Sequence, residues 1–151
     1  MNSKYENIYK NARINAGMKR EPAAEELNIA TRTLDKYESG ELKVPDDVVK
    51  KMCFLYQNSF LAYRHLQKSE LGEFLPAISE TNLSAATVTV MDGYNDFTDI
   101  YKNLIKMVSD GKITKDEKGD WKEAKEQAFD LAAALIAMAI SGDIQNGRTT
   151  A

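Results

Sequence analysis

Residues 23–40 read AAEELNIATRTLDKYESG, and this stretch decides the fold. Apolar residues at helical spacing lead to Leu27, and a second short helical pattern starts at Thr31. Asn28 lies between them, where a sharp reversal needs a residue that tolerates the left-handed conformation, and asparagine is the usual choice after glycine. The stretch therefore predicts two short helices that meet at a steep angle. Their expected shared core is Ala24, Leu27, Ile29, Leu34 and Tyr37.

Length and composition allow one medium domain or two small ones. The chain has 151 residues, 43% of them hydrophobic, and a formal net charge of −3. Residues 1–75 hold 12 Lys and Arg against 11 Asp and Glu, whereas the remainder holds 8 against 12. The relative basicity therefore lies in the first half, although the chain as a whole is not coated in basic residues.

The single cysteine, Cys53, excludes an intrachain disulfide and favours a reducing cytoplasm. The first residues contain no apolar core of a signal peptide. The longest apolar run, LAAALIAMAI at 131–140, is much shorter than the about 20 residues of a membrane span. We therefore expect no membrane partner, and a buried helix face at 131–140.

The rest of the chain also favours helix, because glycine and proline are sparse, with 8 and 3 residues. The expected helices cover 3–16, 20–27, 31–38, a segment with Pro45 in its first turn, 59–68, 83–109 and 121–140. The expected domains are a five-helix unit at 1–70, a polar linker at 71–82, and a helical hairpin or oligomerisation region at 83–151, with a frayed tail at 142–151. The fold class is all-α.

Two short helices joined tightly at a steep angle form a helix-turn-helix, whose second helix lies in the major groove of DNA. Residues 17–40, GMKREPAAEELNIATRTLDKYESG, resemble the Cro/C1-type, or XRE-type, helix-turn-helix family without a gap, and the likeness extends over about residues 5–68. The resemblance implies a lambda-repressor-like domain that binds double-stranded DNA and regulates transcription.

Several positions depart from the family pattern. Asn28 stands where glycine is commoner, and Pro22-Ala23 replace the commoner Gln and Leu, which predicts a changed entry angle of the second helix. Arg20 stands where the family often has a glutamine that anchors a phosphate, a role that an arginine performs more strongly through its charge. Arg13 and Glu38 match positions that often form a structural ion pair in the family, so we expect a scaffold role for them.

Side chains that read DNA are expected on the outward face of the 31–38 helix. The predicted contact residues are Thr31, Arg32, Thr33, Asp35 and Lys36 on this helix, with Arg20, Ser39 and Lys43 beside it. Arg32 is expected to hold guanine O6 and N7 in a bidentate fork, and Lys36 to contact guanine or phosphate. Asp35 is expected to orient Arg32 rather than to accept from a cytosine N4. Exposed helix positions are often charged without any function, which is the alternative interpretation.

The remaining predicted contacts are with the backbone of DNA. Thr31 and Thr33, near the helix start, suit a phosphate or a thymine methyl group. Arg20 and Lys43 flank the helix and suit phosphate, and Ser39 falls in the loop where the family contacts phosphate.

The loop at 110–117 resembles the second half of a calcium-binding EF-hand loop. The positions of the first and third ligands would be Lys106 and Val108, which cannot bind calcium, so no metal and no cofactor are expected. A tight helical hairpin explains the loop better, with Gly111 ending one helix and Thr114 and Glu117 forming a capping box for the next.

Cys53 and His65 could in principle form a nucleophile–base pair. Cys53 lies on a helix that must bury its apolar side, so a core cysteine is the better interpretation. The sequence contains no glycine-rich phosphate loop, GxSxG or HExxH motif. No enzymatic activity is expected.

The second half carries more apolar residues at helical spacing than two or three helices can bury. They are Leu104, Ile105, Val108, Phe129, Ala132, Leu135, Ile136 and Ala139. They are expected to pair with a second copy of the chain, the alternative being that they pack onto the first domain. Residues 98–140 also loosely resemble the C-terminal region of phage CII-like regulators.

The expected function is a sequence-specific transcriptional regulator, resembling the repressors of bacterial phages and mobile elements, that binds operator DNA as a dimer or higher oligomer. The alternative is a protein-interaction or antitoxin-like module that keeps the fold without reading an operator. The low pI, about 5.3, and Asp35 motivate this alternative.

Overall fold

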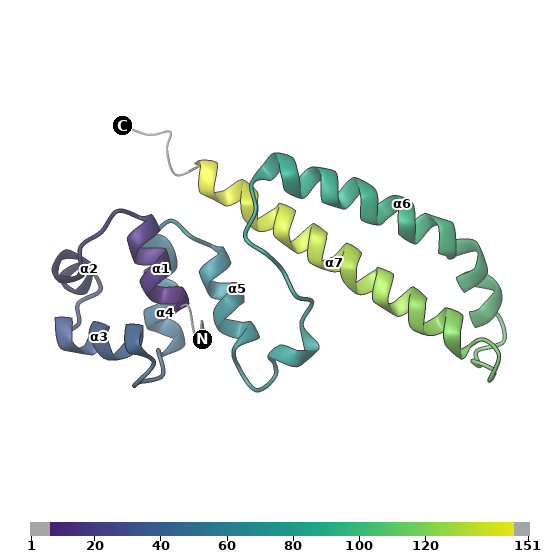
Figure 1. Cartoon of the computed structure of the whole chain (residues 1–151), viewed down its shortest axis with the longest axis horizontal. Helices are drawn as coiled ribbons and strands as arrows, with labels where there is room; N and C mark the ends of the chain where they lie inside the picture. Colours follow the sequence, from purple (N-terminus) through teal and green to yellow (C-terminus); the bar gives the residue numbers. More distant parts are fainter. Residues whose placement is uncertain (1–6, 147–151) are drawn as a thin grey trace, which may run out of the picture. The chain divides into compact units, whose positions relative to one another are not determined.

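The computed structural model describes the backbone of residues 7–146, with side chains for all of these except 102 and 142–146. The described part is helical and contains no strand. It divides into two compact units, a first one up to Glu73 and a second one at Phe74–Gly142. Figure 1 shows the short helices of the first unit and the two long helices of the second.

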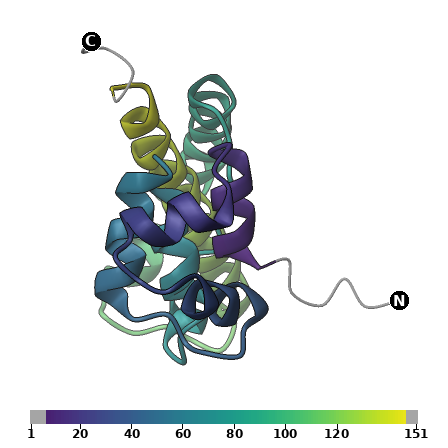
Figure 2. The same ribbon diagram turned by 90° about the vertical axis from the view of Figure 1, so that its left-hand side faces the viewer.

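The first unit holds five α-helices, and a 3-10 turn spans the residue boundary between Glu73 and Phe74. They are α1 (Ile8–Asn15), α2 (Arg20–Glu26), α3 (Thr31–Ser39), α4 (Asp46–Leu55), α5 (Phe60–Gln67) and η1 (Gly72–Phe74). Figure 2 shows the short helices in a second view. The all-α, lambda-repressor-like fold expected from the sequence is confirmed.

The helix boundaries differ from the prediction at two points. The side chain of Asn7 accepts hydrogen bonds from the backbone N–H groups of Tyr9 and Lys10, at 3.0 and 3.2 Å, and so starts α1 at Ile8. Residues 3–6, where the helix was expected to start, lie outside the described residues. Pro45 is the N-cap of α4, not part of its first turn, because its extended ψ of 149° precedes the first helical residue.

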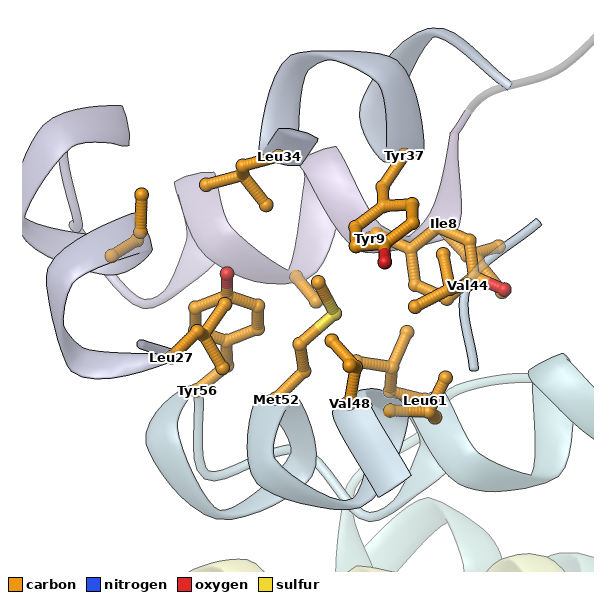
Figure 3. Packing of buried hydrophobic residues seen from close by; sticks show 14 residues of the cluster. Ile8, Tyr9, Leu27, Leu34, Tyr37, Val44, Val48, Met52, Tyr56 and Leu61 are labelled. Atoms are coloured by element: carbon orange, nitrogen blue, oxygen red, sulfur yellow. The ribbon is translucent and has the colours of Figure 1, made fainter. Parts of the chain in front are cut away.

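A single hydrophobic core holds the first unit together. Its buried residues come from all five α-helices and from the loop before α4: Ile8, Tyr9, Ala12, Ala23, Ala24, Leu27, Leu34, Tyr37, Val44, Val48, Val49, Met52, Tyr56 and Leu61. Figure 3 shows the larger ones converging between the helices. The predicted core is confirmed at Ala24, Leu27, Leu34 and Tyr37, and Ile29 is half-buried against it. This core fixes α3 on the unit and leaves its other face to solvent.

Tyr56 introduces a polar atom into this core. Its side chain is buried, and among the described residues its hydroxyl has no hydrogen-bond partner. Burial, together with the negative charge of Glu38, raises the pKa of Tyr56 to about 12, so the neutral phenol is the form that the fold favours.

Replacing Tyr56 by phenylalanine is expected to stabilise the protein by about 1 kcal/mol at neutral pH, because it removes a desolvated hydroxyl without a partner. The wild type loses stability as pH rises from 10 towards 12, because the phenol of Tyr56 loses its proton at a lower pH in the unfolded chain than in the folded protein. Below pH 10 this loss is absent. The variant should therefore unfold less readily than the wild type in this alkaline range. Urea denaturation at pH 7 and pH 11 measures both effects, and a variant less stable than the wild type at pH 7 would show that the hydroxyl is bonded.

The second unit is built on an antiparallel hairpin of α6 (Leu83–Val108) and α7 (Lys118–Asn146), which run side by side in Figure 1. Asn82 caps α6 by accepting from the N–H of Ala85 at 2.9 Å. Thr87 and Thr89 do not interrupt the start of α6, because each hydroxyl donates to the carbonyl four residues earlier, at 2.8 and 3.0 Å.

Both ends of α7 differ from the prediction. The Glu117 carboxylate accepts from the N–H and the hydroxyl of Thr114, at 2.9 and 2.7 Å, which is one half of the expected capping box. α7 itself begins at Lys118, so this pair closes the turn before the helix and does not cap it. The helix also continues to Asn146, so 142–146 are helical and not a frayed tail, and 147–151 lie outside the described residues.

Gly93 lies on the side of α6 that faces α7. A Cβ atom built at this position would lie 3.6 Å from the Cα and the Cδ1 of Leu131, which is ordinary van der Waals contact. The space at Gly93 therefore admits a methyl group, and its helical backbone does not require glycine.

Gly93→Ala is expected to stabilise the hairpin by about 0.5–1 kcal/mol, because alanine has the higher helix propensity and the added methyl group fits. Gly111→Ala is the matched control, for which the opposite change in stability is expected. Its φ of 72° is left-handed, so the same substitution there is expected to destabilise by about 1 kcal/mol. Thermal unfolding followed by circular dichroism measures both, and a loss of stability in Gly93→Ala would mean that the methyl group does not fit between α6 and α7.

Candidate nucleic-acid interface

The turn between α2 and α3 sets the position of the interface. Asn28 has a φ of 55°, so the predicted left-handed turn residue is confirmed. Its N–H donates to the carbonyl of Glu25 at 2.9 Å, and the N–H of Ile29 donates to that of Ala24 at 3.0 Å. These two bonds form a Schellman motif, which ends α2 and lets α3 begin at Thr31, three residues after Asn28.

α3 has one face in the core and one towards solvent. Leu34, Tyr37 and Glu38 are buried, whereas Arg32 and Ser39 are exposed. The other predicted contact residues of the helix, Thr31, Thr33, Asp35 and Lys36, are partly exposed. The face that α3 offers to a partner is therefore polar and charged.

An open depression of about 450 Å³ lies along this face. It is lined by Lys10, Arg20, Arg32, Asp35, Lys36, Glu38, Ser39 and Glu41. Five of the eight predicted contact residues are thus brought together, whereas Thr31, Thr33 and Lys43 do not line the depression. Thr31 and Thr33 lie in the first turn of α3, and Lys43 is exposed in the loop before α4.

Sequence reasoning missed Lys10, Glu38 and Glu41 as parts of this depression. Lys10 is an exposed residue of α1, and the likeness to the family carried no signal for it. Glu41 follows the end of α3, and its role becomes visible only in the fold. Four positively charged side chains and three carboxylate side chains surround the depression.

Two ion pairs cross the depression in the free protein. Arg20 Nη1 lies 2.8 Å from Asp35 Oδ1, and Lys36 Nζ lies 3.0 Å from Glu41 Oε1. The four side chains remain between 34% and 61% exposed, so each pair contributes little, about 0–1 kcal/mol. A phosphate can replace either carboxylate at small cost. In the free protein Asp35 pairs with Arg20, and an orienting role of Asp35 toward Arg32 stays a prediction.

Ser39 has a structural part in the turn after α3. Its hydroxyl donates to the carbonyl of Lys36 at 3.1 Å and accepts from the N–H of Glu41 at 3.4 Å. Gly40 follows with a φ of 78°, and the N–H of Leu42 donates to the carbonyl of Lys36 at 3.1 Å. Ser39 therefore fixes the end of α3.

A buried ion pair holds α3 against α1. Arg13 Nε lies 2.6 Å from Glu38 Oε1, Arg13 Nη2 donates to Oε2 at 2.8 Å, and Arg13 Nη1 donates to the carbonyl of Met18 at 2.8 Å. The hydrogen bond to Glu38 raises the pKa of Arg13. The side chain of Asn7 also reaches α3, donating to the carbonyl of Tyr37 at 3.0 Å. The predicted scaffold pair is confirmed, and it fixes the orientation of α3 on the unit.

Cys53 and His65 do not form a nucleophile–base pair. Both line a cavity of about 370 Å³ between α4 and α5. His65 Nδ1, however, is bonded to the hydroxyl of Tyr9 at 2.6 Å, and its Nε2 to Asp46 Oδ1 at 2.9 Å. Burial raises the pKa of the Cys53 thiol, which opposes formation of the thiolate. Both nitrogens of His65 thus serve to tie α5 to α1 and α4.

Neither a metal-binding cluster nor a membrane-spanning helix is found in the described part of the chain. No group of three or more His, Cys, Asp or Glu side chains there is placed to hold a metal ion. None of its helices has both the length and the apolar content to cross a membrane.

Comparison with known proteins identifies the first unit. Residues 10–59 match the helix-turn-helix family, over a segment that contains α2, the turn at Asn28, α3 and α4. No curated protein and no solved structure matches the chain. The looser likeness of 98–140 to phage CII-like regulators stays a prediction, because the family match ends at residue 59. Residues 10–59 of this chain are therefore similar to the helix-turn-helix family, in agreement with the resemblance of their sequence to its Cro/C1 type.

Proposed function

We propose that the protein is a sequence-specific transcriptional regulator, a repressor from a bacterial phage or mobile element, that binds operator DNA as a dimer or higher oligomer. The observation that carries the proposal is the outward face of α3, where Arg32 and Lys36 lie beside Arg20 around one depression. Arg32 is exposed and free to make the bidentate contact with guanine that arginine prefers in the major groove.

The other contact residues position the helix on the duplex. Arg20 and Lys36 exchange their carboxylate partners for phosphates, and Lys43 adds a further exposed charge next to α3. Thr31 and Thr33 contact phosphate or a thymine methyl group at the N-terminal end of α3. Because one recognition helix reads few base pairs, two copies read half-sites about 34 Å apart, or a multiple of this distance.

Selection of bound sequences from a random duplex pool tests the proposal. The wild type is expected to enrich an inverted repeat, which the Arg32→Ala/Lys36→Ala variant loses. Lys50→Ala/Lys51→Ala is the matched control, because it removes the same charge from exposed positions of α4 outside the depression. A folded wild type that enriches nothing, or a control that loses the repeat as well, would contradict the proposal.

The alternative is a module that binds an acidic or mixed-charge protein partner through the same face. The three carboxylates around the depression favour this alternative. The two functions differ in salt dependence, because each phosphate contact adds about 0.9 to the slope of log affinity against log salt. A steep slope with duplex DNA supports the regulator, and retention of a protein partner in high salt supports the module.

A further inference from the structure

The four positively charged side chains around the depression differ in whether they already hold a carboxylate. Arg20 and Lys36 each form an ion pair, at 2.8 and 3.0 Å. Lys10 and Arg32 are exposed, and neither has an ion-pair partner among the described residues. Arg32 lies on α3 and suits a base edge, whereas Lys10 comes from α1 and has no role in the proposed function. Lys10 is therefore a charge on this face that still lacks a partner.

The fold holds Lys10 beside the C-terminal half of α3. Asn7 lies about one turn before Lys10, and its side chain donates to the carbonyl of Tyr37 at 3.0 Å. Arg13 lies about one turn after Lys10, and its Nη2 donates to Glu38 at 2.8 Å. Side chains three residues apart are neighbours on the surface of a helix. Lys10 therefore lies between two residues of α1 that are both bonded to α3.

The backbone of α1 is fixed at Lys10, whereas the side chain is not. The N–H of Lys10 donates to the side chain of Asn7 at 3.2 Å, and the neighbouring Tyr9 and Ala12 belong to the hydrophobic core. The ammonium group of a lysine is carried by a flexible four-carbon chain. The fold thus sets the place of this charge next to α3, and the side chain can adjust to a bound partner.

A phosphate of the DNA backbone is the partner that suits Lys10. The two sugar-phosphate strands border the major groove, which is about 12 Å wide and is filled by the helix that reads it. A helix packed beside the reading helix therefore meets a phosphate strand and not the base edges. A lysine ammonium is a compact point charge, which binds phosphate without the planar geometry that a base edge requires.

We propose that Lys10 binds a backbone phosphate beside the end of α3 in any DNA duplex, and that it contributes more to sequence-independent binding than Arg20 or Lys36. The inference rests on the proposed function, to which it adds a positioning residue and an order of contacts. On random sequence, Arg20 and Lys36 gain a phosphate only by giving up a carboxylate, whereas Lys10 has none to give up. Lys10 therefore holds α3 against the duplex before any base is recognised.

Fluorescence anisotropy with a random-sequence duplex at several salt concentrations tests the proposal. Lys10→Ala is expected to weaken binding about fivefold to tenfold at about 0.1 M salt, and to lower the slope of log affinity against log salt by about 0.9, the value of one phosphate contact. Lys10→Arg keeps the charge and should restore both quantities. Lys51→Ala is the matched control, because it removes an exposed lysine of α4 outside the depression, and it should change affinity by less than about twofold.

Removal of a whole ion pair provides the comparison with the paired cations. Arg20→Ala/Asp35→Ala leaves the net charge of the chain unchanged and removes one internally neutralised cation. With random DNA it is expected to lower the salt slope by less than half as much as Lys10→Ala does. An equal or larger fall would overturn the claim that Lys10 contributes more than the paired cations.

Ethylation interference on the selected operator locates the contact. Ethylation removes the charge of single phosphates, and one position is expected to hinder the wild type but not Lys10→Ala. Lys10→Ala should still enrich the same inverted repeat, because a phosphate contact carries no sequence information. An unchanged urea midpoint shows that the exposed substitution leaves the fold intact.

The inference and the proposed function fail in different ways. A salt slope of Lys10→Ala equal to that of Lys51→Ala, or an effect of Lys10→Ala on the operator alone, would overturn the inference while an enriched operator upholds the function. A wild type that binds random duplexes with the expected dependence on Lys10, but enriches no sequence, would overturn the proposed function while this inference stands.

Discussion

Arg13→Ala is expected to lower the free energy of unfolding of the first unit by about 3–5 kcal/mol. The side chains of Arg13 and Glu38 are 7% and 4% exposed and are joined by two hydrogen bonds. Removing the arginine leaves the Glu38 carboxylate and the carbonyl of Met18 desolvated without this partner. Such a loss is a large part of the 5–15 kcal/mol that stabilises a typical domain.

Urea denaturation followed by circular dichroism measures this loss. Lys51→Ala, at an exposed position of α4, is the control and is expected to change stability by less than about 0.5 kcal/mol. Arg13→Met/Glu38→Leu should recover much of the lost stability, since replacing both charges removes the unpaired one. A loss in Arg13→Ala no greater than in Lys51→Ala would show that the pair does not hold α1 to α3.

Arg32→Ala/Lys36→Ala is expected to weaken the complex with the selected operator by about 2–5 kcal/mol, because two contacts with bases or phosphate are lost. The slope of log affinity against log salt should fall by about 1 if Lys36 contacts phosphate, and should not change further if Arg32 contacts only a base. Fluorescence anisotropy with operator and scrambled duplexes at several salt concentrations measures both quantities.

Asp35→Asn provides the opposite change on the same face. It releases Arg20 from the ion pair in which Arg20 Nη1 lies 2.8 Å from Asp35 Oδ1, and it removes a negative charge from the depression. The affinity for any duplex should therefore rise by several-fold. The Lys50→Ala/Lys51→Ala control should leave operator affinity within about twofold. If the Arg32 and Lys36 variant binds no worse than this control, α3 does not read the operator.

The fold was predictable where local chemistry and spacing agree. Asn28 is the clearest case. A left-handed residue is needed there to end α2 three residues before α3 begins, and few residue types adopt this conformation. Gln57, with a φ of 50°, ends α4 in the same way, but glutamine carries no such signal and this turn was missed. The boundaries at Pro45 and Glu117 were misplaced because several residues in a row were compatible with a helix start.

The placement of the candidate residues on α3 was predictable from the sequence, whereas their ion-pair partners were not. Helical spacing alone places Leu34 inward and Arg32 outward on α3. The pairing of Asp35 with Arg20 depends on the angle between α2 and α3, and the presence of Lys10 depends on how α1 packs. These contacts depend on how the helices pack against one another, which the periodicity of a single helix does not predict.

The ion pairs across the depression also bear on how the protein would search a genome. Random DNA attracts a protein mainly through unpaired positive charge, and here Arg20 and Lys36 already hold carboxylates in a chain of net charge −3. We therefore expect short residence on random sequence and little sliding, with most encounters ending in rapid release. Such a protein locates its target by repeated dissociation and rebinding. It remains bound only where base contacts with α3 add to the replacement of the Asp35 and Glu41 carboxylates by phosphates.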